Sequence, residues 1–150
     1  MPPLVRPENK NVNEKEPQIA NINFQTDISS NIIQIKFKNF ITKALVDTGA
    51  SISCISHALL NKLFQSQNHK KVQLQNSKVT HARGVGGDLL KISGEVDLQL
   101  QIADQPFTQK FYVFERLHQS IILGVDFLEK NGCTICYKTK TLQSNVGQPI

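Results

Sequence analysis

The sequence predicts a mostly β fold with one or two short helices, in a single domain of 150 residues. Several short segments alternate apolar and polar residues, as strands with one buried face do. A glycine-rich stretch separates two strand-like arms, which is typical of a hairpin tip. Apolar residues at helical spacing occur in two short stretches.

Residues 1–24 are polar and have no period that would bury a face, so we expect a disordered N-terminal tail or a polyprotein linker there. The folded domain is expected over residues 25–150. Residues 33–37 alternate and predict a half-buried strand, and residues 41–46 predict a second strand that is more apolar at its end.

A short strand over residues 52–55 is expected next, followed by a helix over residues 57–63 with Ser56 as its N-cap. The glycine-rich stretch then predicts a mobile hairpin over residues 79–92. The remaining expected elements are strands over residues 95–102, 107–114 and 121–123, a short helix from residue 127 to Asn131-Gly132, and a hairpin over residues 134–143.

Composition narrows the function classes. No apolar stretch approaches the roughly 18 residues of a membrane span, so no membrane partner is expected. Three cysteines make a disulfide-stapled secreted domain improbable and favour a reducing, cytoplasmic location. The net charge is +5, and residues 48–87 contain no acid. Arginine is scarce there and no aromatic residues interleave with the basic ones, so nucleic acid is not expected as a partner.

Asp47-Thr48-Gly49 is the most informative motif. It ends the apolar run 44–46, so a carboxylate is expected at the end of a buried strand, with a hydroxyl to fix it and a glycine that lets another backbone approach. The chain has one such triplet, which suggests half of a two-carboxylate site that a second copy completes. The alternative is an ordinary turn in which the aspartate caps backbone N–H groups.

Three segments together resemble the retropepsin-like aspartic proteases, and are most similar to the protease domains of LTR retrotransposons (gypsy-like) and their domesticated cellular relatives. Residues 47–51 resemble the catalytic loop of that family, residues 84–87 its flap, and residues 122–128 the apolar strand and glycine that pack behind the loop. The resemblance spans about residues 30–143 and implies a retropepsin-like acid protease half-barrel that is active as a homodimer.

One position departs from the family's pattern. Many retroviral members follow the glycine of the second motif with an arginine that pairs with an acid just after the catalytic triplet. Here these positions are Val125 and Ser51, so that salt bridge cannot form. The departure favours the transposon-like and cellular relatives over vertebrate retroviruses.

The resemblance implies that Asp47, Thr48 and Gly49 are catalytic, and that a water between two Asp47 carboxyls hydrolyses extended peptide segments. The natural substrate is expected to be the chain's own retroelement polyprotein, in the cytoplasm or within virus-like particles. No cofactor and no metal are implied. The implied substrate-binding residues are Ala50, Gly84, Val85, Gly86, Gly87, Ile121 and Leu123, of which Ile121 and Leu123 could equally be core.

Two other functions stay open. The first is a catalytically silent retropepsin-fold module for dimerisation or peptide binding. The second is a basic nucleic-acid-binding domain, which rests on residues 57–83 alone. A zinc site is not expected, because Cys133 and Cys136 lack a second pair and a strand would place them on opposite faces.

Overall fold

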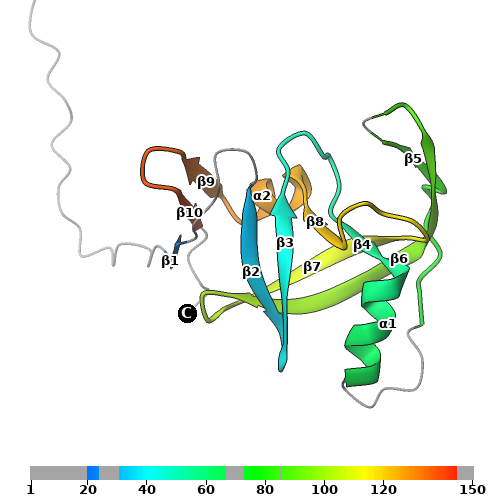
Figure 1. Cartoon of the computed structure of the whole chain (residues 1–150), viewed down its shortest axis with the longest axis horizontal. Coiled ribbons are helices and arrows are strands. Elements are labelled where there is room, and N and C mark those ends of the chain that lie inside the picture. Colours follow the sequence, from blue (N-terminus) through cyan, green and yellow to red (C-terminus); the bar gives the residue numbers. More distant parts are fainter. Residues whose placement is uncertain (1–19, 24–30, 67–72, 85, 145–150) are drawn as a thin grey trace, which may run out of the picture.

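The computed structural model of the chain describes residues 20–23, 31–66, 73–84 and 86–144 (Figure 1). The described part is mostly strand with two helices, which confirms the predicted fold class. In chain order the elements are β1 (Ala20–Asn23), β2 (Ile32–Phe37), β3 (Phe40–Val46), β4 (Cys54–Ser56), α1 (His57–Ser66), β5 (His81–Arg83), β6 (Leu89–Ile102), β7 (Gln105–Phe114), β8 (Ile121–Leu123), α2 (Val125–Lys130), β9 (Cys133–Cys136) and β10 (Thr141–Ser144).

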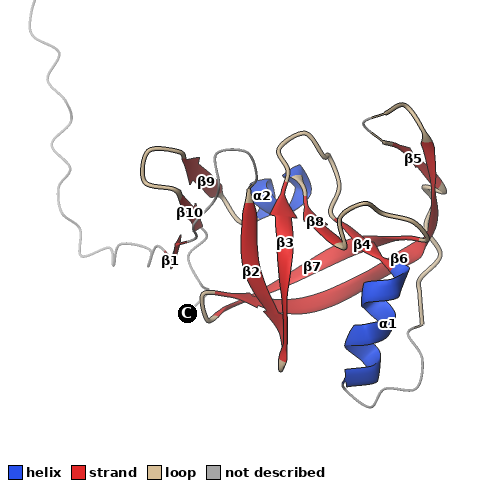
Figure 2. Ribbon diagram, in the orientation of Figure 1, coloured by secondary structure: helices blue, strands red, loops and turns tan. Residues whose placement is uncertain are grey.

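A seven-stranded sheet in the order β2-β3-β8-β4-β7-β6-β5 forms the body of the domain (Figure 2). Its first strand also pairs with β6 at Lys36 and Gln101, so the sheet curls round and closes on itself. Most neighbours are antiparallel, but β3 runs parallel to β8, with Val46 opposite Leu123. The segments that follow β3 and β8 therefore leave the sheet side by side.

Local sequence explains the two long hairpins of this sheet. In β2, Ile33, Ile35 and Phe37 are all buried, as their alternation predicted. In β6 the inward residues Val96, Leu100 and Ile102 are buried in the same core, and the β6–β7 hairpin turns through Ala103 and Asp104, both with positive φ. A clean alternation therefore set the register of each strand.

Helix α1 begins where its cap was expected. The Ser56 hydroxyl accepts a hydrogen bond from the backbone N–H of Leu59 at 3.1 Å. Leu59, Leu60 and Leu63 are buried on one face of the helix. No helix in the described part of the chain is long and apolar enough to cross a membrane.

A second, smaller sheet joins the two ends of the described chain in the order β1-β10-β9. Strand β1 pairs antiparallel with β10, from Ala20 opposite Ser144 to Asn23 opposite Thr141. These four residues lie in the segment for which a disordered tail was predicted, so that expectation does not hold for them. Residues 1–19 lie outside the described residues.

Candidate active site

Asp47 follows directly after β3, at the end of the barrel where the β3–β4 loop begins. Its backbone N–H donates to the carbonyl of Leu123 in β8 at 3.0 Å, which extends the parallel pairing by one residue. The side chain is half-buried, while Thr48 and Gly49 are exposed. The Gly49 N–H donates to Asp47 Oδ1 at 2.8 Å. This bond leaves Oδ2 without a hydrogen bond among the described residues.

The loop after Asp47 rests on the first turn of α2. The N–H of Val125 donates to the carbonyl of Ala50 at 2.7 Å, and the N–H of Asp126 donates to the carbonyl of Ser51 at 3.3 Å. A Cβ atom at Gly124 would lie 2.5 Å from the carbonyl oxygen of Ile52 and 2.7 Å from that of Ala50. Glycine is therefore required at position 124 for the loop to approach the helix this closely.

Behind the loop, the Asp126 carboxylate accepts four hydrogen bonds. Ser53 donates two of them, from its N–H at 3.0 Å and its hydroxyl at 2.6 Å. The Gln109 amide donates a third at 3.1 Å and the N–H of Phe127 a fourth at 2.7 Å. Asp126 was part of the second motif in the sequence, but no sequence pattern marked Ser53 or Gln109 as its partners.

The predicted flap is a hairpin between β5 and β6, with Gly84, Gly86 and Gly87 at its tip. The Gly84 N–H donates to the Asp88 carbonyl at 2.8 Å, and the Gly87 N–H donates back to the Gly84 carbonyl at 2.9 Å. Arg83 Nη1 also donates to the Gly87 carbonyl, at 3.0 Å. No described residue from 81 to 91 is buried. Val85 lies outside the described residues.

A small apolar cluster connects the base of the β5–β6 hairpin with the loop after Asp47. Its buried centre is Cys54, Ile92 and Phe114. The partly buried residues packed on it come from the loop, the flap arms, β7, β8 and the segment before β8, and are Ile52, Ala82, Leu90, Tyr112, Leu117 and Ile122. This cluster is separate from the main core of the barrel.

The three apolar residues of strand β8 lie in different surroundings. Ile121 and Leu123 are 1% and 0% exposed and belong to the main core. Ile122 lies between them, is half-buried and packs on the small cluster beside the loop. Successive side chains in a strand point to opposite faces, so Ile122 faces the loop and flap side. The two side chains expected to line a substrate pocket therefore point into the core instead.

Cys54 follows the loop and lies within the electrostatic reach of its acids. The pKa of the Cys54 thiol is raised to about 12, mainly by burial and to a smaller extent by the negative charges of Asp126 and Asp47. A thiol held protonated in this way is a poor nucleophile. The described residues contain no group of three or more His, Cys, Asp or Glu side chains that could hold a metal ion.

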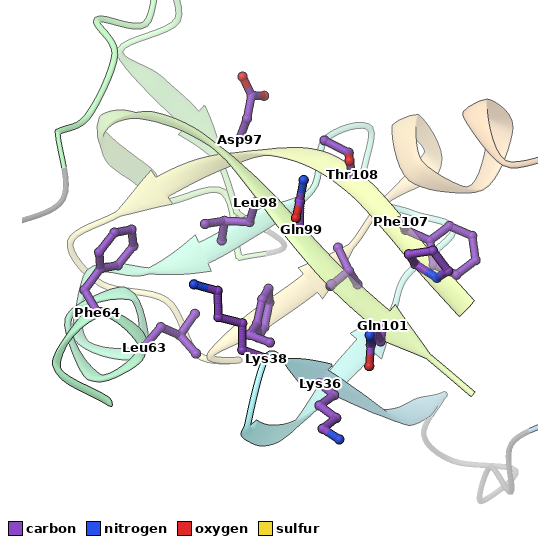
Figure 3. A pocket seen from close by; sticks show the side chains of 13 residues that line it. Lys36, Lys38, Leu63, Phe64, Asp97, Leu98, Gln99, Gln101, Phe107 and Thr108 are labelled. Carbon is purple, nitrogen blue, oxygen red and sulfur yellow. The ribbon is translucent and has the colours of Figure 1, made fainter. Parts of the chain in front are cut away.

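A hollow of about 500 Å³ lies away from Asp47, between the end of β2, α1 and the β6–β7 hairpin (Figure 3). Its lining includes the two lysines Lys36 and Lys38 and the apolar residues Leu63, Phe64 and Leu98. The β2–β3 turn is at the opposite end of β3 from Asp47. None of the predicted site residues lines this hollow.

Residues 43–148 match the family described as the PEG10/RTL1 protease domain. Protein DDI1 homolog 1 of Caenorhabditis elegans is 30% identical over 125 residues, which are 77% of this chain and 28% of that protein. The chain thus spans a little over a quarter of the length of this curated relative.

Two solved structures share the fold. The retroviral protease-like domain of Ddi1 from Leishmania major superposes with a TM-score of 0.61 at 19% identity, over 79% of this chain and 90% of that one. The EIAV protease in complex with the inhibitor HBY-793 superposes with a TM-score of 0.58 at 18% identity, over 75% of this chain and 99% of that one.

Proposed function

Because the chain belongs to the PEG10/RTL1 protease-domain family of retropepsin-like proteins, we propose that it is an aspartic endopeptidase assembled from two copies. One observation carries the proposal. Asp47 follows β3 on a short loop that α2 holds from behind, and one of its carboxylate oxygens has no hydrogen bond among the described residues. This is the arrangement that an acid needs when it must exchange a proton with a water.

A single chain supplies one usable acid to this site. Asp126 is the other acid of the loop region, but both of its oxygens are occupied by the donors from Ser53, Gln109 and Phe127. An aspartate in that state cannot receive a proton from water without losing those bonds. The second carboxyl is therefore the Asp47 of a second copy, and the active enzyme is a homodimer.

Two carboxyls within hydrogen-bond range share one proton, because like charges that close do not both ionise. The ionised Asp47 takes a proton from the water between them, and the water oxygen attacks the scissile carbonyl carbon. The protonated Asp47 gives its proton to the carbonyl oxygen, which produces a tetrahedral diol. The diol then returns a proton to the amide nitrogen as the carbon–nitrogen bond breaks.

The substrate is an extended peptide with apolar side chains near the cleaved bond. The flap hairpin, with Gly86 and Gly87, offers backbone groups that can pair with an extended chain. The partly buried Ile52, Ile122 and Leu117 offer apolar surface on the small cluster between the loop and the flap arms. Ala50 adds a small apolar side chain on the loop itself. We assign the contact with substrate side chains to Ile122 in place of Ile121 and Leu123. The natural substrate is the polyprotein that contains this domain.

The test is cleavage of a proteome-derived peptide library, followed by mass spectrometry, with Asp47→Asn as the key variant. We expect cleavage by the wild-type chain to fall by about 10³-fold or more in Asp47→Asn, since both proton transfers depend on that carboxyl. Asp104→Asn is the matched control, because Asp104 is exposed in the β6–β7 turn and its positive φ suits asparagine.

Three outcomes separate the possible functions. Loss of cleavage in Asp47→Asn with a normal Asp104→Asn supports the proposal. Cleavage by Asp47→Asn at the wild-type rate would overturn the mechanism. If the wild-type chain forms a dimer in solution and cleaves nothing in the library, the fold is a silent dimerisation or peptide-binding module.

A further inference from the structure

Among the described residues, no side-chain ion pair supports the loop of residues 47–53. Position 51 is a serine and position 125 is a valine, so neither residue brings a charge to the contact between loop and helix. Five hydrogen bonds nevertheless connect residues 50–53 with residues 124–126. Three of the five involve Ser53, which donates from its N–H and uses its hydroxyl both as a donor and as an acceptor.

Ser53 lies completely buried at the point where the loop enters β4. Its hydroxyl donates to Asp126 Oδ1 and accepts a bond from the N–H of Gly124 at 3.0 Å. Its N–H donates to the other carboxylate oxygen. Ser53 therefore joins the helix start to the loop through three bonds, one from its backbone N–H and two from its hydroxyl. Two of the three end on a charged acceptor and are correspondingly strong.

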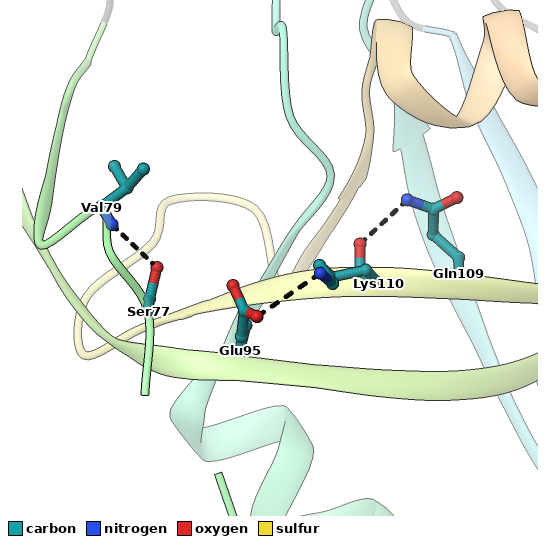
Figure 4. Close-up of polar contacts among 5 residues, drawn as sticks. All are labelled: Ser77, Val79, Glu95, Gln109 and Lys110. Atoms are coloured by element: carbon teal, nitrogen blue, oxygen red, sulfur yellow. Dashed lines mark hydrogen bonds and ion pairs between the residues drawn. The ribbon is translucent and has the colours of Figure 1, made fainter. Parts of the chain in front are cut away.

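Gln109 approaches the same carboxylate from β7 and is 4% exposed. Its Nε2 donates to Asp126 Oδ2 at 3.1 Å and to the carbonyl of Lys110 at 2.9 Å (Figure 4). Its Oε1 is buried and has no hydrogen-bond partner in the described part of the chain. Leaving this acceptor unpaired is unfavourable. The two bonds that the NH₂ group donates offset this cost and hold the amide in its orientation.

We propose that Asp126, Ser53 and Gln109 are positioning residues that fix the catalytic loop so that its Asp47 meets the Asp47 of a second copy. This inference rests on the proposed function. A two-carboxyl site tolerates displacements of about 0.5 Å. The network ties the loop to α2 and β7, two elements that pack in the main core through Phe127 and Phe111. Each chain thus presents its acid in a fixed place before the dimer forms.

Asp126→Asn is the main test variant. Oδ1 accepts from the Ser53 hydroxyl and the Phe127 N–H, and Oδ2 accepts from the Ser53 N–H and Gln109 Nε2. An NH₂ group at either position would face at least one donor, so the network is broken in both orientations. Glu129→Gln is the matched control, since it removes one negative charge from the exposed side of the same helix.

Two measurements are made on the full chain. Hydrogen exchange reports the protection of the amides of residues 50–54, with residues 96–102 as an internal reference. In Asp126→Asn we expect exchange of the loop amides to accelerate by about tenfold while the reference changes little. Steady-state cleavage should show kcat reduced by about 10- to 100-fold with KM within a few-fold of wild type, since the network does not contact substrate.

Ser53→Ala and Gln109→Met keep the proposal testable if Asp126→Asn does not fold. Both should change loop exchange and kcat in the same direction, with a smaller effect for Gln109→Met, which removes one bond from Asp126. The proposal would be overturned if the loop amides of these variants exchanged at the wild-type rate. It would also be overturned if exchange rose equally at the loop and reference amides while kcat was retained. A wild-type chain that does not cleave would refute the proposed function, and the exchange data would still decide whether the network fixes the loop.

Discussion

The loop after Asp47 (residues 47–53) and the predicted flap (residues 81–91) are both turns that contain glycine, but the molecule holds them in opposite ways. Five hydrogen bonds join the loop to the start of α2, and Ser53 at the end of the loop is fully buried. The flap from residue 81 to 91 has no buried residue among those described, and the bonds at its tip are made within the hairpin. The loop is therefore held by contacts with residues distant in the sequence, whereas the flap tip is held by contacts within its own hairpin.

This contrast matches the functions proposed above for the two segments. A pair of acids that shares one proton needs a fixed geometry, whereas a peptide substrate must enter and leave. Segments with few buried contacts open at low free-energy cost, while segments tied into the core open only with the whole domain. Substitutions that strain the loop should therefore act on global stability, and those in the flap should act on substrate handling.

The largest expected effect comes from Gly124→Ala. The added methyl group would lie 2.5 Å from the carbonyl oxygen of Ile52, which is backbone and cannot move without the loop. We expect the free energy of unfolding to fall by about 3 kcal/mol or more, and cleavage to be lost with it. Urea unfolding followed by circular dichroism measures the change.

Gly86→Ala in the flap is the matched control for that substitution. The nearest atom to its added methyl group is Asp88 Oδ2 at 3.8 Å, an ordinary contact distance. The free energy of unfolding should stay within about 0.5 kcal/mol of wild type. If Gly124→Ala and Gly86→Ala destabilise the domain equally, the two segments do not differ in support.

A smaller effect, confined to the flap, is expected for Gly87→Ala. Gly87 has φ of 84° and an added methyl group would meet nothing within 4 Å, so the cost is conformational rather than steric. That cost is about 1 kcal/mol, which corresponds to roughly a five- to tenfold loss in kcat/KM if the closed flap needs this conformation. Gly87→Asn should recover most of the loss, because asparagine tolerates positive φ. An unchanged kcat/KM in Gly87→Ala would contradict this account.

The features that the sequence predicted well depend on local patterns. The alternation of residues 33–37 and 95–102 set which side chains are buried, Ser56 marked the start of α1, and three glycines marked the flap tip. Each of these signals lies within a few residues of what it predicts. Helix periodicity, strand periodicity and turn chemistry are all of this kind.

The features that were missed depend on contacts between distant residues. Ser53 is 73 residues from Asp126, and nothing in its neighbourhood marks it as the partner of that carboxylate. In β8 three apolar residues in a row carry no alternation, so the sequence could not tell Ile122 from its two neighbours. Strand β1 is only four residues long, and its place is set by pairing with β10, which is more than 110 residues away in the chain.

Labelling of the cysteine thiols tests the support of the loop in a third way, with a smaller expected effect. Burial raises the pKa of the Cys54 thiol from its ordinary value of 9.0 to about 12, whereas hydrogen bonds from Thr139 lower the pKa of Cys136 in the exposed β9–β10 hairpin. At pH 8 the thiolate fraction of Cys54 is therefore about a thousandfold below that of an ordinary cysteine. Iodoacetamide should label Cys136 first and leave Cys54 unmodified, as peptide mass spectrometry would show. Equal labelling of both thiols in the folded chain would contradict the support assigned to the loop.

The same thiol makes stability depend on pH in the alkaline range. The folded chain keeps Cys54 protonated while the unfolded chain ionises it, so the contribution of this thiol is present below about pH 9 and is lost as the pH rises towards 12. Cys54→Ala should flatten this part of the pH dependence of the unfolding free energy. If the slope persists unchanged in Cys54→Ala, another titrating group is its cause.

The smallest effect is expected for Arg83→Gln. The bond from Arg83 to the Gly87 carbonyl is exposed at 3.0 Å, and exposed bonds of this kind contribute about 0.5 kcal/mol or less. We expect an unfolding free energy equal to that of Lys62→Gln, which removes one exposed charge from α1, and a KM raised by no more than about twofold. Removing the two hydrogen bonds of the buried Ser53 hydroxyl should cost more than this, because the groups left behind are shielded from water. If Arg83→Gln instead destabilises the domain as much as Ser53→Ala does, the flap is tied to the core, and the division between a fixed loop and a free flap fails.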